Sequence, residues 1–104
     1  MINKNCNIIM HRDNTLSLFD RLKKAESMIS FWSEKRGIES VEVQSWINTV
    51  ESIILTLGAI SDNLGILANK NPYSESAKNI RYQIYEIEDR IQAANTYIGY
   101  YKMN

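Results

Sequence analysis

The feature that most constrains the fold is a repeat of apolar residues in the last third of the chain. From Ser74 to Tyr101 these residues recur in alternating steps of three and four, at Ala77, Ile80, Ile84, Ile87, Ile91, Ala94, Ile98 and Tyr101. This spacing is the a/d seam of a helix that packs lengthwise against other helices, whereas a strand would need a period of two. The segment therefore predicts a long helix and an all-α fold.

The segment from about Thr15 to Arg36 has the same helical spacing. Its seam consists of Leu18, Leu22, Ala25, Ile29 and Trp32. Asp13 or Asn14 can cap its start, and Gly37 can take the left-handed conformation that ends many helices. We therefore expect a helix here, preceded by a flexible N-terminal tail at residues 1–13.

The middle of the chain predicts another helix, the second in chain order, which begins after Ser40, a favourable N-cap, and ends before the turn at Pro72. Asn71, with Pro72 at the first helical position, or Ser74 can cap the helix that follows. Its seam consists of Val43, Trp46, Val50, Ile53, Leu57, Ile60, Leu64 and Leu67, widened by Ile47 and Ile54. Gly58 and Gly65 lie inside this helix, together with Ala59 and Ser61. These small residues either admit the close approach of another backbone or are simply tolerated by a strong seam, and a bend near Gly58 is possible.

Three long helices joined by short connections favour antiparallel neighbours. We expect residues 14–104 to form a single domain, an up-down-up three-helix bundle in which the second and third helices make a long hairpin. Isoleucine at both a and d positions is also compatible with self-association.

The composition restricts the function classes. Lys and Arg together number 12, as do Asp and Glu, so the 104-residue chain has a formal net charge of zero and lacks the field of a general nucleic-acid binder. The run Ile53–Ile60 is too short to cross a membrane, and no secretory signal is evident. These features predict a soluble cytoplasmic protein, with secretion without a signal peptide left open.

Groups suited to catalysis are few. His11 is the only histidine and Cys6 the only cysteine, and both belong to the expected tail. A zinc site needs about four ligands, so neither a metal nor another cofactor is expected. Glu86, Glu88 and Asp89 are interpreted as a solvated helix face, and the chain is predicted not to be an enzyme.

Tyrosines supply the remaining signal. In the heptad register of the last helix, Tyr82, Tyr85 and Tyr100 point away from the isoleucine seam. Tyrosine is enriched in interface hot spots because it buries a large area and keeps a polar group. With Tyr97 they could form a partner-binding face, or the first helix could cover them as part of the core. The preferred hypothesis is a non-enzymatic interaction protein, such as an inhibitor, immunity protein, chaperone or assembly subunit, which binds another protein and possibly itself.

A second hypothesis is a nucleic-acid-binding regulator that uses the basic end of the first helix. Its candidate contacts are Arg21, Lys24, Lys35 and Arg36. The helix that follows Gly37 begins without Arg or Lys and is long for a recognition helix, which disfavours this hypothesis.

A third hypothesis comes from architecture. Tyr85 and Asp89 match the Tyr-x-x-x-Asp spacing of an export tag, and in this respect the hairpin resembles the small secreted helical-hairpin proteins of type VII secretion. It is also similar to needle subunits and small chaperones of type III secretion, which have a Pro-containing turn. The resemblance implies a subunit or chaperone of a secretion system. Trp32 and Trp46 depart from the type VII Trp-x-Gly motif, and the additional first helix departs from the type III plan.

Overall fold

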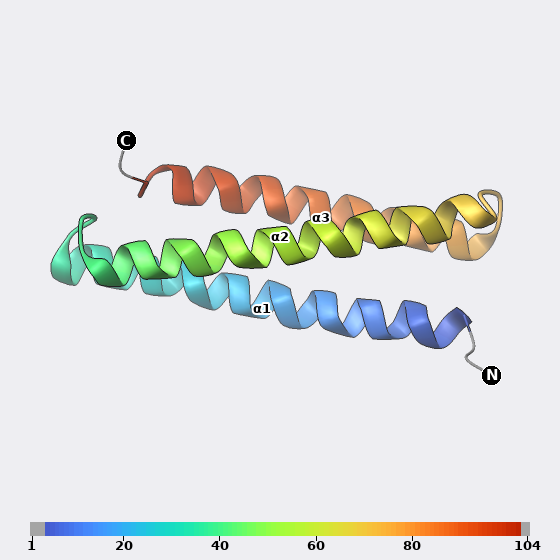
Figure 1. Cartoon of the computed structure of the whole chain (residues 1–104), viewed down its shortest axis with the longest axis horizontal. Coiled ribbons are helices and arrows are strands. Elements are labelled where there is room, and N and C mark those ends of the chain that lie inside the picture. Colours follow the sequence, from blue (N-terminus) through green and yellow to red (C-terminus); the bar gives the residue numbers. More distant parts are fainter. Residues whose placement is uncertain (1–3, 103–104) are drawn as a thin grey trace.

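The computed structural model describes the backbone of residues 4–102 and the side chains of residues 14–102. These residues form three helices, α1 (Lys4–Arg36), α2 (Val41–Lys70) and α3 (Glu75–Gly99), and no strand. The helices alternate in direction, and short turns join them at opposite ends of the molecule (Figure 1). The predicted all-α, up-down-up bundle with an α2–α3 hairpin is therefore confirmed.

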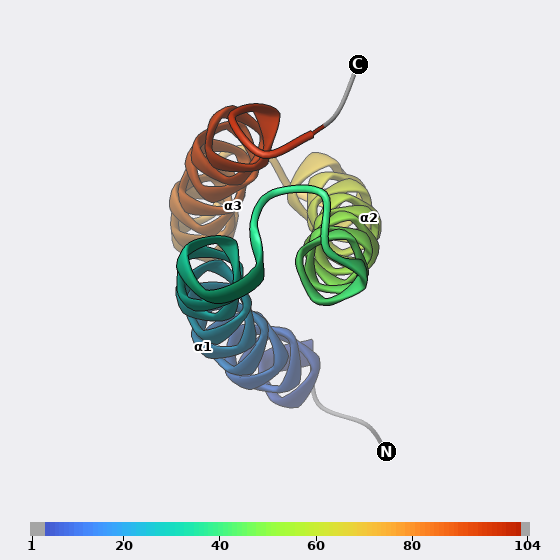
Figure 2. The same cartoon turned by 90° about the vertical axis from the view of Figure 1, so that its left-hand side faces the viewer.

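Helix α2 is the element against which both other helices pack. Seen end-on, α1 and α3 lie on one side of α2, and α1 diverges from α3 toward its N-terminus (Figure 2). The α1–α3 contact is the smallest of the three. The buried core of the described residues is one cluster, made of branched aliphatic residues, alanines and Phe19: Leu18, Phe19, Leu22, Ala25, Ile29, Val43, Ile47, Val50, Ile53, Leu57, Ile60, Leu64, Ala68, Ala77, Ile80, Ile87, Ala94 and Ile98.

The predicted helix boundaries hold at both turns. The Ser40 hydroxyl accepts a hydrogen bond from the Val43 N–H at 3.2 Å. The Ser74 hydroxyl does the same for the Ala77 N–H at 3.0 Å, so that Ser74, of the two candidates, is the cap of α3. Gly37 has φ of +87°, the left-handed conformation expected of it. Each cap satisfies a backbone donor that the helix itself leaves without a partner.

The expected start of the first helix is wrong. Helix α1 begins at Lys4, so neither Asp13 nor Asn14 caps it and most of residues 1–13 extends the helix. The asparagines in this segment cost only some tenths of a kcal/mol each in a helix. No glycine or proline precedes Gly37, so nothing in the sequence terminates the helix at residue 14. The flexibility of residues 1–13 stays a prediction.

The buried side of α2 is rotated slightly from the predicted seam. Ile47 and Ala68 are buried, whereas Trp46 and Leu67 are only half-buried at the edge of the core. Ile84 and Ile91 of α3, and Tyr101 just after it, are likewise half-buried. A helix that contacts two neighbours at different points along its length buries a broad side, which a single a/d seam does not describe.

The small residues of α2 do not admit another helix of the same chain. A Cβ atom added at Gly58 or Gly65 would meet nothing within 4 Å. Helix α2 continues through both glycines without a break. The structure therefore supports the second interpretation, that α2 tolerates these glycines without using them to pack closely on α1 or α3.

Candidate partner-binding surface on helix α3

Four residues of α3 form a basic and aromatic surface beside the α2–α3 turn. Lys78, Arg81, Tyr82 and Tyr85 line a shallow concavity of about 380 Å³. Their spacing of three, one and three residues places them on one side of a helix. We call these four residues the tyrosine face.

The tyrosine face is open to solvent. Tyr82 is 70% exposed and Tyr85 is 77% exposed, although the core-facing residues of the same helix are buried. One interpretation of the sequence was that the first helix covers these tyrosines, and the structure shows that α1 does not cover them.

The described lining of this concavity is positively charged. Its two ionised side chains, Lys78 and Arg81, are both cations, and none of the described residues that line it is acidic. The Arg81 guanidinium donates a hydrogen bond to the Pro72 carbonyl at 3.0 Å, which holds it against the turn. A guanidinium has five N–H donors, so further donors remain for an external acceptor. The face thus presents aromatic area beside positive charge.

The other two predicted tyrosines do not join this face. Tyr100 is exposed, but it lies at the far end of α3, about 27 Å from Tyr82 along the helix axis at 1.5 Å per residue. Tyr97 packs against the core and donates a hydrogen bond to the Glu26 carbonyl of α1 at 2.8 Å. Its ring centroid is 5.3 Å from that of Tyr101. Partial burial, followed by the influence of Tyr101 and Glu26, raises the pKa of Tyr97 to about 12. Tyr97 therefore joins α1 to α3.

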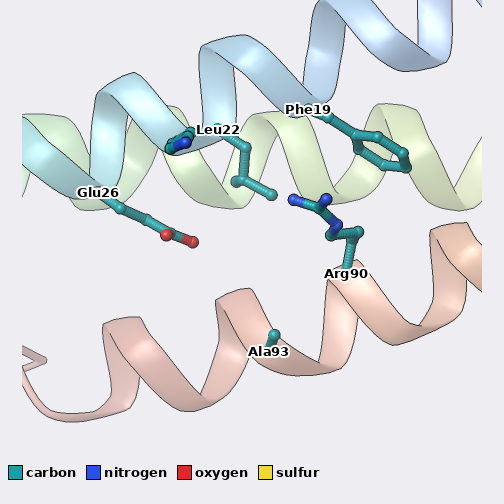
Figure 3. A pocket seen from close by; sticks show the side chains of 6 residues that line it. Phe19, Leu22, Glu26, Arg90 and Ala93 are labelled. Atoms are coloured by element: carbon teal, nitrogen blue, oxygen red, sulfur yellow. The ribbon is translucent and has the colours of Figure 1, made fainter.

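A second concavity lies between α1 and α3 and was not anticipated from the sequence. It measures about 250 Å³, and Figure 3 shows five of its lining side chains labelled; the full set is Phe19, Leu22, Lys23, Glu26, Arg90 and Ala93. Glu26 and Arg90 extend into it from opposite helices (Figure 3). The Arg90 guanidinium lies 4.9 Å from the Phe19 ring centroid, a cation–π contact across the helices. Seam periodicity cannot identify such a site, because it depends on which flanks of two helices face each other.

Burial affects the carboxyl group in this second concavity. Partial desolvation raises the pKa of Glu26 above its ordinary value, and the nearby Arg90 charge opposes that rise. Two cations, Lys23 and Arg90, and one carboxylate, Glu26, line the concavity, an arrangement that suits packing between the two helices.

The predicted nucleic-acid contacts do not form one free basic surface. Arg36 lies 3.5 Å from a Glu42 carboxylate oxygen and 5.8 Å from the Trp32 ring centroid. The Lys35 ammonium lies 5.3 Å from the Phe31 ring centroid. Arg21 and Lys24 are exposed farther along α1. Two of the four cations are thus engaged within the chain.

Among the residues with described side chains, 14–102, no three His, Cys, Asp or Glu residues gather closely enough to hold a metal ion. Cys6 and His11 lie outside the described side chains.

The run Ile53–Ile60 is too short to cross a membrane, but helix α2 as a whole is not. Within the described residues α2 is the one helix long and apolar enough to cross a membrane. The mean hydropathy of its most apolar 18 residues is 1.4, and 28% of that stretch is buried. A mostly buried core helix passes the same test, whereas α2 packs one side against α1 and α3 and leaves most of this stretch unburied.

No known protein family, curated protein or solved structure matches this chain.

Proposed function

We propose that this protein is a non-enzymatic interaction module that binds another protein through the tyrosine face. The observation that carries the proposal is the exposure of Tyr82 and Tyr85 beside Lys78 and Arg81 on one side of a rigid helix. The partner surface that fits this face is acidic, with at least one apolar side chain to lie against the tyrosine rings.

Three physical contributions support this proposal. Tyrosine has few rotatable bonds, so burying its ring in an interface gains apolar area at a small entropic cost. Exposed cations add little affinity by themselves, but they accelerate encounter with an acidic partner and fix its orientation. The core beneath the face keeps its backbone in place, so little ordering is needed on binding.

Site-specific photo-crosslinking tests the proposal. A photoreactive phenylalanine analogue is introduced separately at Tyr82, Tyr85 and Tyr100, in the organism that encodes the chain. We expect one discrete adduct with the same protein from the first two positions. Tyr100 is the matched control, since it is also an exposed tyrosine, at the C-cap of α3, but lies outside the face.

Binding of the crosslinked protein is then measured with purified variants. Tyr82→Ala and Tyr85→Ala should each weaken it by about 30-fold, the effect of losing a hot-spot residue worth about 2 kcal/mol. Tyr100→Ala should bind as the wild type does. Equal adducts at all three positions, or an adduct with nucleic acid in place of protein, would count against the proposal.

A further inference from the structure

A second surface, on the outside of α2, is unlike the outer sides of the other two helices. Eight exposed positions follow one another there in steps of four and three: Val41, Ser45, Asn48, Ser52, Leu55, Ala59, Asp62 and Ile66. Seven of them are uncharged, and only Asp62 carries a charge. The exposed residues of α1 and α3, by contrast, include many charges, such as Lys23, Lys24, Glu88 and Asp89. We call these eight positions the α2 stripe.

The α2 stripe contains large apolar side chains with no cover. Val41 is 81% exposed, Leu55 is 76% exposed and Ile66 is 59% exposed. The stripe lies opposite the side of α2 that packs on α1 and α3, and no other helix approaches it (Figure 2). It extends for about 38 Å at 1.5 Å per residue. Its four-three spacing is the seam geometry of one helix packing lengthwise on another.

We propose that the α2 stripe is a homodimer interface in which α2 of a second copy packs antiparallel to it. The order of the residues supports this occupant. About a two-fold axis between Ile53 and Ile54, Leu55 lies opposite Ser52 of the second copy, and Ala59 lies opposite Asn48. At each end Ile66 meets Val41. Large residues at the centre thus face small ones, so that the two surfaces interlock without overlap.

Charge favours the same arrangement. In a parallel pair the two Asp62 carboxylates would face each other, and their negative charges would repel. In the antiparallel pair each Asp62 lies opposite Ser45 of the second copy, a hydroxyl that can donate a hydrogen bond to a carboxylate. The two carboxylates are then about 25 Å apart along the axis at 1.5 Å per residue, well beyond the screening length of about 8 Å at physiological salt. The inference is independent of the tyrosine face, which lies on α3.

The molar mass of the full chain as a function of concentration tests the inference, measured by sedimentation equilibrium. We expect a monomer of 12.1 kDa at low concentration and a dimer of twice that mass at high concentration. Leu55→Lys places charge at the centre of the stripe and should weaken dimerisation by at least about tenfold, as expected for burying an unpaired charge. Gln92→Lys, an exposed site on α3, is the matched control and should leave dimerisation unchanged.

A second substitution tests the antiparallel direction. Ser45→Lys would face Asp62 of the second copy in an antiparallel dimer and its own equivalent in a parallel one. We therefore expect roughly threefold or more tighter dimerisation, since two exposed ion pairs form for each dimer. Circular dichroism of each variant shows whether the helices are retained.

Three results would overturn the inference. The first is a protein that stays monomeric up to about 1 mM, a concentration at which only weak association would be missed. The second is a dimer that Leu55→Lys leaves intact. The third is weaker association of Ser45→Lys than of the wild type. A monomer would leave the stripe to a helix of another protein or to a lipid surface, and added vesicles or the crosslinked partner would separate these two cases.

Discussion

Among single residues, Tyr97 was predicted to lie on a partner-binding surface but packs against the core. Its position in the heptad is close enough to the seam for the ring to pack on the core, and its hydroxyl reaches across to α1. The sequence could not reveal this, because the acceptor is a backbone carbonyl on a helix 71 residues away. Tyr82 and Tyr85, which lie farther from the seam, are exposed as the register predicted.

The Tyr97 hydroxyl gives the first prediction. Tyr97→Phe keeps the ring and removes the 2.8 Å hydrogen bond to the Glu26 carbonyl. The free energy of unfolding should fall by about 1 kcal/mol, the usual net value of one intramolecular hydrogen bond. Urea denaturation measures it. Tyr100→Phe, whose hydroxyl makes no such bond between helices, is the control and should unfold as the wild type does.

Glu26 gives a prediction about pH. Because its pKa is raised in the folded protein, the folded state holds this proton more tightly than the unfolded state does. Ionised Glu26 therefore lowers stability at neutral pH, and this cost disappears as the pH falls below the ordinary value of 4.5. Glu26→Gln should be more stable than the wild type at pH 7, by roughly 0.5 kcal/mol or less, because Glu26 is only half-buried and solvent screens its charge.

Urea denaturation of both proteins from pH 7 to pH 4 measures this difference. The advantage of Glu26→Gln should shrink as the pH falls. An advantage that grows toward low pH would mean that attraction to Arg90 outweighs the effect of burial on Glu26.

At the level of the helices, local sequence signals predicted the two turns. The start of α1 was misplaced, because no such signal marks it. Ser40 and Ser74 cap their helices and Gly37 ends α1, since caps and left-handed glycines depend on only a few neighbouring residues. Asparagine is only a weak helix breaker, and a favourable N-cap sequence does not oblige a helix to begin at that point.

Two glycines should respond oppositely to the same substitution. Gly37→Ala puts a side chain on a residue with φ of +87°, where a Cβ atom costs about 1–2 kcal/mol, so the protein should lose that much stability. Gly58→Ala lies inside α2, where the new methyl group meets nothing within 4 Å, and should gain roughly 0.5–1 kcal/mol. Urea denaturation of both variants measures the two signs. A loss at Gly58 would show that the glycine is needed for close packing.

For the molecule as a whole, the three seams were enough to predict the bundle, because each helix must bury its apolar side against another. They were not enough to predict its surfaces. The tyrosines at 82 and 85 were found from heptad positions alone, but Lys78 and Arg81 joined them only once α3 and the turn were placed. The concavity at Glu26 and Arg90, and the uncovered outer side of α2, depend on which sides of the helices meet.

We propose that the tyrosine face binds a partner protein, and amide chemical-shift mapping can locate the binding surface. The isotope-labelled chain is titrated with the protein identified through crosslinking. We expect the largest shifts between Lys78 and Tyr85, with little change at Tyr100. Largest shifts on α1, or on the outer side of α2 with α3 unchanged, would contradict the proposal.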